Sequence, residues 1–280
     1  MKKGIFVKVK ARNVTIHLGD PTNSEYFDHD RASFSQVVVA GEYDDILSSI
    51  KPGDVVIDAG ANIGCFTVLA GKKVGQMGLV VAIEPEPRNH TRLLSNIKLN
   101  KLENVVVFNR AIYSSDEIEV GFHGIGVLGA VTSNGTTMVK TVRLSTLAEK
   151  LSLKRIACIK MDIEGSELHA FNDPGFDCVL RLTNEMAVEV HNKESLVAVR
   201  NSLKAHGFQV AEMKYEHSFL LRVVKRSMIH PFLMFRLYRR HVFSVLKRLL
   251  SSRLSSCSKM SISQVEESIF EAGILIAKRD

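Results

Sequence analysis

Short apolar runs alternate with longer stretches of helical periodicity through most of the chain, from residue 54 to residue 214. Each run has the length of a strand and is rich in Val and Ile, whereas the stretches between the runs are long enough for helices. Two parallel strands need a crossover connection, usually a helix, so this alternation predicts a mostly parallel sheet covered by helices on both faces. The predicted strands are residues 54–58, 79–84, 104–108, 156–162, 186–190 and 207–214, with residues 273–278 pairing with the last of them.

The predicted fold class is therefore α/β: a doubly wound, Rossmann-like sheet with additions before, within and after it. Residues 1–50 are predicted as short strands and turns with a short helix at 42–50, and the glycine-rich residues 113–143 as hairpin or loop additions. The predicted helices are residues 62–72, 88–100, 145–151, 167–171 and 193–206. The domain bounds that follow are 1–50 for an N-terminal β-rich and helical addition, 51–224 for the core, 225–266 for a helical insertion and 267–280 for a terminal strand that completes the sheet.

The first candidate binding motif is Asp-Ala-Gly-Ala-Asn-Ile-Gly at residues 58–64, between the first strand and its helix. Gly60 and Gly64 allow a tight turn and a close approach of the backbone to a ligand. The free N–H groups of the helix N-terminus suit a carboxylate, and Asp58 at the strand end is placed to accept from an ammonium group. Asn62 stands where the dinucleotide fingerprint has a glycine, which excludes that motif. An ordinary strand-to-helix turn is the alternative interpretation.

The second candidate is Glu84, which ends the next strand and lies 26 residues after Asp58. In nucleotide-binding sheets a carboxylate at this place binds the ribose hydroxyls. The alternative is a solvated surface glutamate, but the spacing from the glycine turn favours ribose binding.

Two later strands end in further polar residues. Asp162 and Glu164 lie at and just beyond one strand end, within residues 159–167, and His191 follows the next strand. Because ligands bind beyond the carboxyl ends of such strands, we expect Asp162 and His191 at one edge. An imidazole with a pKa of roughly 6.5 suits proton removal near neutral pH, and a carboxylate can orient a hydroxyl or act as a base. The alternatives are a structural histidine, and acidic residues such as Glu167 that merely favour a helix N-terminus.

Together these segments resemble the FkbM family of methyltransferases. The resemblance runs in order from about Gly41 to about Lys214, and is carried by residues 41–43, 51–64, 83–85, 109–112 and 159–167. It implies a class I methyltransferase fold that uses S-adenosylmethionine and transfers a methyl group to an oxygen, commonly a hydroxyl of a sugar, a lipid-linked glycan or a natural product. It also implies contacts of Asp58, Gly60, Asn62 and Gly64 with the methionine end of the cofactor, of Glu84 with the ribose, and of Asn109 to Ala111 with the adenine.

Methyl transfer requires an acceptor oxygen aligned behind the sulfonium methyl, and orientation supplies much of the acceleration. A neutral alcohol also benefits from losing its proton as the bond forms. We expect His191 or Asp162 to accept that proton, with Glu164 as a third catalytic candidate. No metal is assigned: a divalent metal held by Asp162 and Glu164 is an alternative for which the sequence gives no complete ligand set.

The positive charge of the chain is concentrated in one late segment. The formal net charge is +7, yet ten Lys and Arg and no Asp or Glu lie between Glu216 and Glu266, which leaves 27 basic and 30 acidic residues elsewhere. Whole-chain basicity is therefore no argument for a nucleic-acid partner, and we expect none.

Within that segment, residues 231–251 predict a helix with Phe and Leu on one face and Arg and Lys beside it. The helix is too charged to span a membrane. It either packs on its own domain or on a second copy of the chain, as in a homo-oligomer, or lies on an anionic membrane through residues 228–254. The four cysteines form no metal-binding or disulfide pattern and the chain begins without a signal peptide, so we expect a cytoplasmic protein, peripheral at the inner membrane surface if the helix binds lipid.

The preferred function is an O-methyltransferase of glycan or small-molecule hydroxyls. One alternative is an RNA methyltransferase, suggested by the basic insertion; against it, no Asn-Pro-Pro-aromatic tetrapeptide follows the fourth strand. The other is a non-catalytic membrane or partner adaptor that keeps the cofactor fold; against it, the glycine turn and Glu84 are intact.

Overall fold

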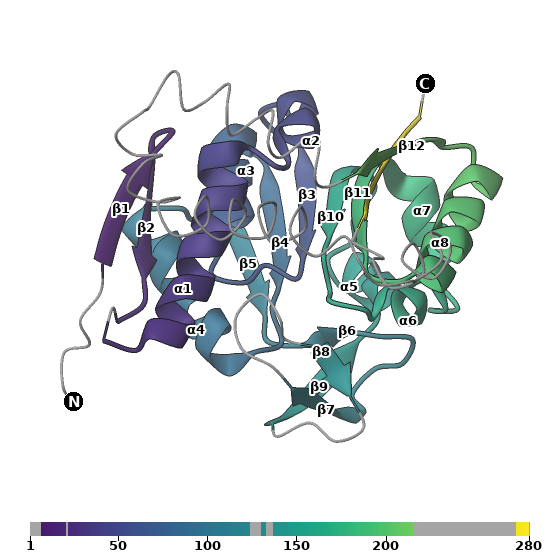
Figure 1. The fold of residues 1–280 in the computed structure, drawn as a ribbon. Helices are drawn as coiled ribbons and strands as arrows, with labels where there is room; N and C mark the ends of the chain where they lie inside the picture. Colours follow the sequence, from purple (N-terminus) through teal and green to yellow (C-terminus); the bar gives the residue numbers. More distant parts are fainter. Residues whose placement is uncertain (1–6, 21, 124–129, 133–136, 215–272, 280) are drawn as a thin grey trace, which may run out of the picture.

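The computed structural model describes residues 7–20, 22–123, 130–132, 137–214 and 273–279. Its centre is a seven-stranded sheet in the order β12-β13-β11-β10-β3-β4-β5 (Figure 1). Neighbours from β11 to β5 are parallel, and β13 is antiparallel to both β11 and β12. The predicted mostly parallel sheet is therefore confirmed, as is the pairing of the last two strands. Its members are β3 (Val55–Ala59), β4 (Leu79–Ile83), β5 (Val105–Phe108), β10 (Ile156–Met161), β11 (Thr183–Val190), β12 (Gln209–Lys214) and β13 (Gly273–Lys278).

Helices cover both faces of this sheet. Successive strand residues point to opposite sides, and the apolar residues on each side are buried under a different set of helices. Val56 and Val80 pack with α3, whereas Ile57 and Val81 pack in a second core with α5, α7 and α8. The helix α7 was not predicted from the sequence. The helices of the first face are α3 (Cys65–Val74) and α4 (Pro87–Leu99), and those of the second are α5 (Leu144–Lys150), α6 (Glu167–Phe171), α7 (Phe176–Leu182) and α8 (Lys193–Ala205).

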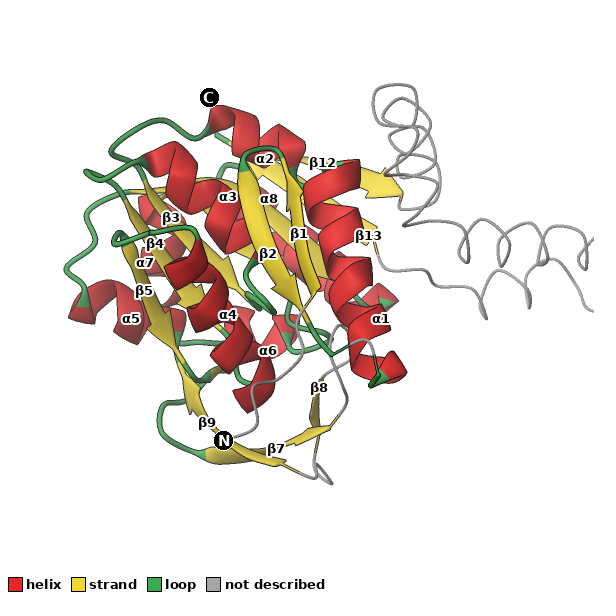
Figure 2. Cartoon of the chain, turned by 90° about the vertical axis from the view of Figure 1, so that its left-hand side faces the viewer, coloured by secondary structure: helices red, strands yellow, loops and turns green. Residues whose placement is uncertain are grey.

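The N-terminal addition contains a hairpin, as predicted, but its second part is helical. Strands β1 (Val7–Ala11) and β2 (Val14–Leu18) pair in an antiparallel hairpin, and α1 (Ser24–Ser33), the π-helix η1 (Phe34–Ala40) and α2 (Asp44–Ser49) follow (Figure 2). The prediction of strands and turns up to residue 41 is thus wrong beyond β2. The run Val37–Val39 has β propensity, but its side chains are buried in the core that α3 and β2 share, and tertiary packing overrides propensity.

A smaller four-stranded sheet in the order β6-β9-β7-β8 follows the edge strand β5 and lies apart from the main sheet in Figures 1 and 2. It confirms the hairpin additions predicted for residues 113–143. Its strands are β6 (Ala111–Ile112), β7 (Glu119–His123), β8 (Ala130–Thr132) and β9 (Thr137–Val142).

The predicted insertion at 225–266, with its helix at 231–251 and the lipid-facing span 228–254, lies outside the described residues. Within the described part of the chain, no helix is both long enough and apolar enough to cross a membrane.

Candidate active site

A cavity of about 300 Å³ lies where β3, β4, β10 and β11 end. This is the edge at which the sequence predicted ligand binding. Its walls come from parts of the chain that are far apart in sequence: η1, the turns after β3 and β4, the segment after β5, and the ends of β10 and β11. The small sheet contributes Ile112 and Phe122.

Gly60 is required where the turn after β3 touches the loop after β10. Its φ is +78°, and a Cβ at this position would lie 1.7 Å from the backbone oxygen of Asp162. The turn is also fixed from the other side, since Gly60 N and Ala61 N both donate to the carbonyl of Ile83, each at 2.9 Å. Only glycine permits this contact between the two strand ends, so the first motif is more than an ordinary turn.

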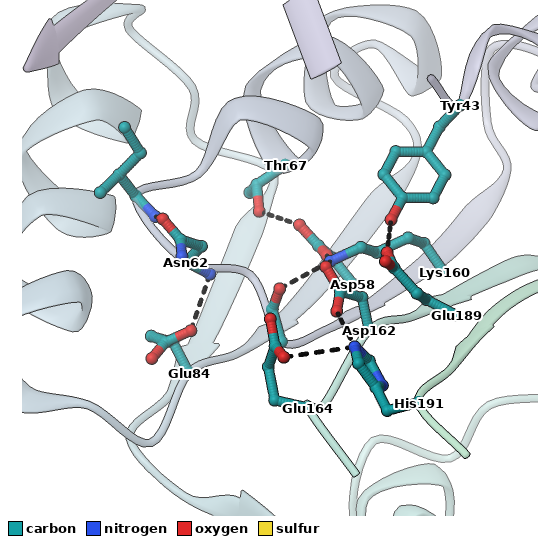
Figure 3. Close-up of polar contacts among 12 residues, drawn as sticks. Tyr43, Asp58, Asn62, Thr67, Glu84, Lys160, Asp162, Glu164, Glu189 and His191 are labelled. Atoms are coloured by element: carbon teal, nitrogen blue, oxygen red, sulfur yellow. Dashed lines mark hydrogen bonds and ion pairs between the residues drawn. The ribbon is translucent and has the colours of Figure 1, made fainter. Parts of the chain in front are cut away.

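Glu84 is buried at the cavity wall rather than solvated, and its carboxylate is oriented by two backbone amides, of which that of Asn62 is drawn in Figure 3. Asn62 N donates to Oε2 at 2.7 Å and Glu86 N donates to Oε1 at 2.9 Å. Burial raises the pKa of Glu84 to about 7, and the two N–H donors oppose that rise. Such a carboxylate is positioned to accept from ligand hydroxyls.

Of the residues predicted to contact the cofactor, four line the cavity: Gly60, Asn62, Glu84 and Ala111. The other three, Asp58, Gly64 and Asn109, lie behind its wall. Asp58 is fully buried, accepts from Thr67 Oγ1 at 2.5 Å and lies 3.4 Å from Lys160 Nζ.

Gly64, with φ +91°, begins α3 against Leu93. Asn109 Nδ2 donates to the carbonyls of Glu84 and Pro85. Among the described residues, Asp58, Gly64 and Asn109 thus support the loops that form the cavity rather than form its surface.

The three predicted catalytic residues, Asp162, Glu164 and His191, lie together on the side of the cavity away from Glu84, as Figure 3 shows. His191 Nε2 lies 3.2 Å from Glu164 Oε2 and 4.0 Å from Asp162 Oδ1, while His191 Nδ1 lies 2.9 Å from Oε1 of the buried Glu167. Burial alone lowers the pKa of His191, but the hydrogen bonds with Glu164 and Glu167 outweigh it and raise the pKa to about 11. The ordinary histidine pKa assumed from the sequence therefore does not apply in this protein.

Lys160 was not singled out from the sequence. Its ammonium is buried, donates to the carbonyl of Gly60 at 2.6 Å, and lies 3.4 Å from Asp58 Oδ1 and 3.5 Å from Asp162 Oδ2. Burial lowers the pKa of Lys160, but Asp162 and Asp58 reverse this and raise it. A lysine inside an apolar strand, directly before Met161-Asp162, was the available signal, since a buried cation requires a buried partner.

Two more carboxylates line the cavity beside this group, Glu42 and Glu189. Tyr43 Oη donates to Glu189 Oε2 at 3.2 Å. Burial raises the pKa of Glu189 well above its usual range, and the negative charges of Asp162 and Glu42 add to the effect. Glu189 was predictable in principle: it lies two residues before His191 at the end of one strand, and such residues share a face.

A parallel sheet with one antiparallel strand between its last two members, and with a glycine turn and an acidic strand end at the same edge, defines a class I methyltransferase. Comparison with known families agrees: the methyltransferase FkbM domain matches residues 58–210. The chain therefore belongs to the FkbM methyltransferase family, as the sequence motifs indicated.

Among characterised relatives, the hexuronic acid methyltransferase AglP of Haloferax volcanii is 28% identical over 150 residues, which cover 52% of this chain and 59% of that protein. The 31-O-demethyl-FK506 methyltransferase FkbM of Streptomyces tacrolimicus is 26% identical over 200 residues, covering 58% of this chain and 75% of that protein. The solved FkbM methyltransferase of Methylobacillus flagellatus KT is 16% identical, with a TM-score of 0.45 over 68% of this chain and 50% of that one. The last likeness is too distant to assign a function.

Proposed function

We propose that this protein transfers a methyl group from S-adenosylmethionine to a hydroxyl oxygen of a sugar, glycan or other small-molecule acceptor. The observation that carries the proposal is the division of one cavity into two chemically different sides. One side holds Glu84 and the glycine turn, and the other holds Asp162, Glu164 and His191.

The first side fits the cofactor. Glu84, held by two amides, is placed to accept from both ribose hydroxyls, and the turn at Gly60 brings backbone close to a ligand without side-chain obstruction. Arg110 and Ala111, just after β5, border the same side and suit the adenine end. Bound S-adenosylmethionine supplies a methyl group already activated by the sulfonium charge.

The second side fits an acceptor hydroxyl. Asp162 lies between Lys160 and His191, so its carboxylate is held in place and can accept the hydroxyl proton as the new bond forms. His191, bridging Glu164 and Glu167, fixes the orientation of Glu164. Because these two carboxylates raise the pKa of His191 to about 11, its imidazole is protonated near neutral pH, and this favours Asp162 as the proton acceptor of the two residues predicted for that role. The name of one relative, a 31-O-demethyl-FK506 methyltransferase, supports an oxygen acceptor, and the name of another, a hexuronic acid methyltransferase, supports a sugar acid as the acceptor molecule.

The RNA methyltransferase alternative is disfavoured by the charge of the cavity. Glu42, Asp162 and Glu164 line it, and the cations Lys160 and His191 beside them are already paired with carboxylates, so this wall is unfavourable for a phosphate backbone.

The test is product analysis with labelled S-adenosylmethionine and three acceptor sets: uronic acids and their glycosides, neutral sugars, and a transfer RNA transcript. We expect a methyl ether on a sugar, and for Asp162→Asn a fall in single-turnover rate of about 100-fold or more with cofactor affinity unchanged. Asp177→Asn is the matched control, because Asp177 pairs with His206 outside the cavity and is 68% exposed. Methylation of RNA alone, or a full rate for Asp162→Asn, would refute the proposal; cofactor binding without any turnover would favour the adaptor alternative.

A further inference from the structure

Asp162, Glu164 and His191 each direct one potential metal-ligand atom into a common space. These three atoms all lie within 4.8 Å of one another. A small divalent cation with ligand bonds of about 2.1 Å holds adjacent ligands about 3 Å apart and opposite ligands about 4.2 Å apart. The observed separations, 3.2 Å from His191 Nε2 to Glu164 Oε2 and 4.0 Å from His191 Nε2 to Asp162 Oδ1, fall in that range.

The imidazole of His191 is oriented as metal-bound imidazoles usually are. Its Nδ1 lies 2.9 Å from Oε1 of Glu167, which is fully buried and also accepts from Gly165 N at 2.9 Å. Histidine ligands typically donate the far N–H to such a carboxylate, which fixes the tautomer and leaves the other nitrogen for the metal. With Nδ1 donating to Glu167, Nε2 faces the carboxylate of Glu164; a metal ion bound there would displace the proton that Nε2 holds without it. Two acceptors at 3.2 Å need a proton or a cation between them.

The carboxylates around this point also favour binding of a cation. Asp162 Oδ1 is buried and accepts no hydrogen bond in the described part of the chain. Lys160 lies on the other side of that carboxylate, 3.5 Å from Oδ2, and is engaged by Gly60 and Asp58. The carboxylate of Glu42 lines the same cavity. Buried negative charges are ordinarily paired or coordinate metals.

We propose that Asp162, Glu164 and His191 form a divalent cation site, with Mn²⁺ as the fitting ion, because two carboxylates and one imidazole combine the ligand types of Mg²⁺ with those of the transition metals. The inference rests on the proposed function in one respect: the ion faces the acceptor side, where its open positions would take an acceptor hydroxyl, orient it and favour loss of its proton. The preferred acceptors are then sugars or polyols whose hydroxyls can ligate the ion.

The test is a Mn²⁺ titration of the full chain after removal of metals with a chelator, with no cofactor or acceptor present. The free-ion electron paramagnetic resonance signal reports binding. We expect one saturable site in the wild type, a loss of affinity of at least tenfold for Glu164→Gln and for His191→Gln, and a loss of about 10–100-fold for Glu167→Gln, which acts through His191. Asp177→Asn, which alters an Asp–His pair outside the cavity, is expected to bind as the wild type does.

Circular dichroism and binding of S-adenosylhomocysteine, measured on the same samples, show that each variant is folded. Wild-type protein that takes up no stoichiometric Mn²⁺, or Glu164→Gln and His191→Gln variants that bind it as tightly as wild type, would overturn the site. Cofactor binding without Mn²⁺ binding removes this inference alone, whereas Mn²⁺ binding without cofactor binding removes the proposed function and leaves the metal site standing.

Discussion

Replacing Gly60 by alanine probes the contact on which the cavity depends. The added Cβ would lie 1.7 Å from Asp162 O, where a separation of at least 3.0 Å is needed, so the two strand ends must move apart by more than an ångström. That movement strains the hydrogen bond from Asp162 N to Ala59 O, 3.0 Å long, and displaces both sides of the site. Gly53→Ala is the matched control, because Gly53 also has a positive φ, +88°, but no atom lies within 4 Å of its added Cβ.

Both substitutions carry the backbone cost of a side chain at positive φ, about 1–3 kcal/mol. Gly60→Ala adds an overpacking cost of about 1–3 kcal/mol, which Gly53→Ala does not have. A displacement of about 1 Å at a catalytic site can also cost 100-fold in rate, and we expect a similar loss of cofactor affinity.

Urea denaturation gives the difference in the free energy of unfolding between the two variants, and calorimetry with S-adenosylhomocysteine gives the difference in affinity. We expect Gly60→Ala to have the lower free energy of unfolding and the lower affinity for S-adenosylhomocysteine. If Gly60→Ala binds the ligand within about threefold of Gly53→Ala, the contact between the two loops does not shape the site and this reasoning is wrong.

Two further predictions concern buried charges. The pKa of Glu84 is raised from 4.5 to about 7, so its protonated form stabilises the fold; this contribution is complete below pH 4.5 and is lost as pH rises through about 7. Glu84→Gln is therefore expected to be more stable than wild type at pH 8 by up to about 3 kcal/mol but not at pH 4.5, and a stability difference independent of pH in urea denaturation would contradict this. Lys160→Met removes the cation beside the fully buried Asp58 and is expected to lower the free energy of unfolding by about 3–5 kcal/mol. Adding Asp58→Asn to it should restore part of that loss, whereas strictly additive losses would show that the two residues do not interact.

Much of the fold followed from the sequence because strand periodicity and parallel topology are local and regular properties. The same topology brings Asp162 and His191, 29 residues apart, to one sheet edge without any knowledge of side-chain packing. The helical path of residues 24–40 did not follow, because Val37–Val39 favour a strand locally and only burial against α3 and β2 decides otherwise.

The role predicted for Asp58 illustrates a second limit. From the sequence, Asp58 was expected to accept from a ligand ammonium group. In the parallel pairing of β3 and β10, Asp58 lies opposite Lys160, and the lysine ammonium takes that place. Strand register between segments 100 residues apart decides which cation the carboxylate meets, and no local pattern shows it.

Calorimetry tests most directly whether this cavity binds S-adenosylmethionine with Glu84 at the ribose. Wild-type protein is titrated with S-adenosylmethionine and with S-adenosylhomocysteine at pH 8, and Glu84→Ala is titrated in parallel. Because hydrogen bonds to a charged group contribute about 1.5–3 kcal/mol each, loss of two should weaken binding by about 100-fold or more while the variant stays folded. Absence of binding of either ligand by the wild type, or undiminished binding by Glu84→Ala, would contradict the account.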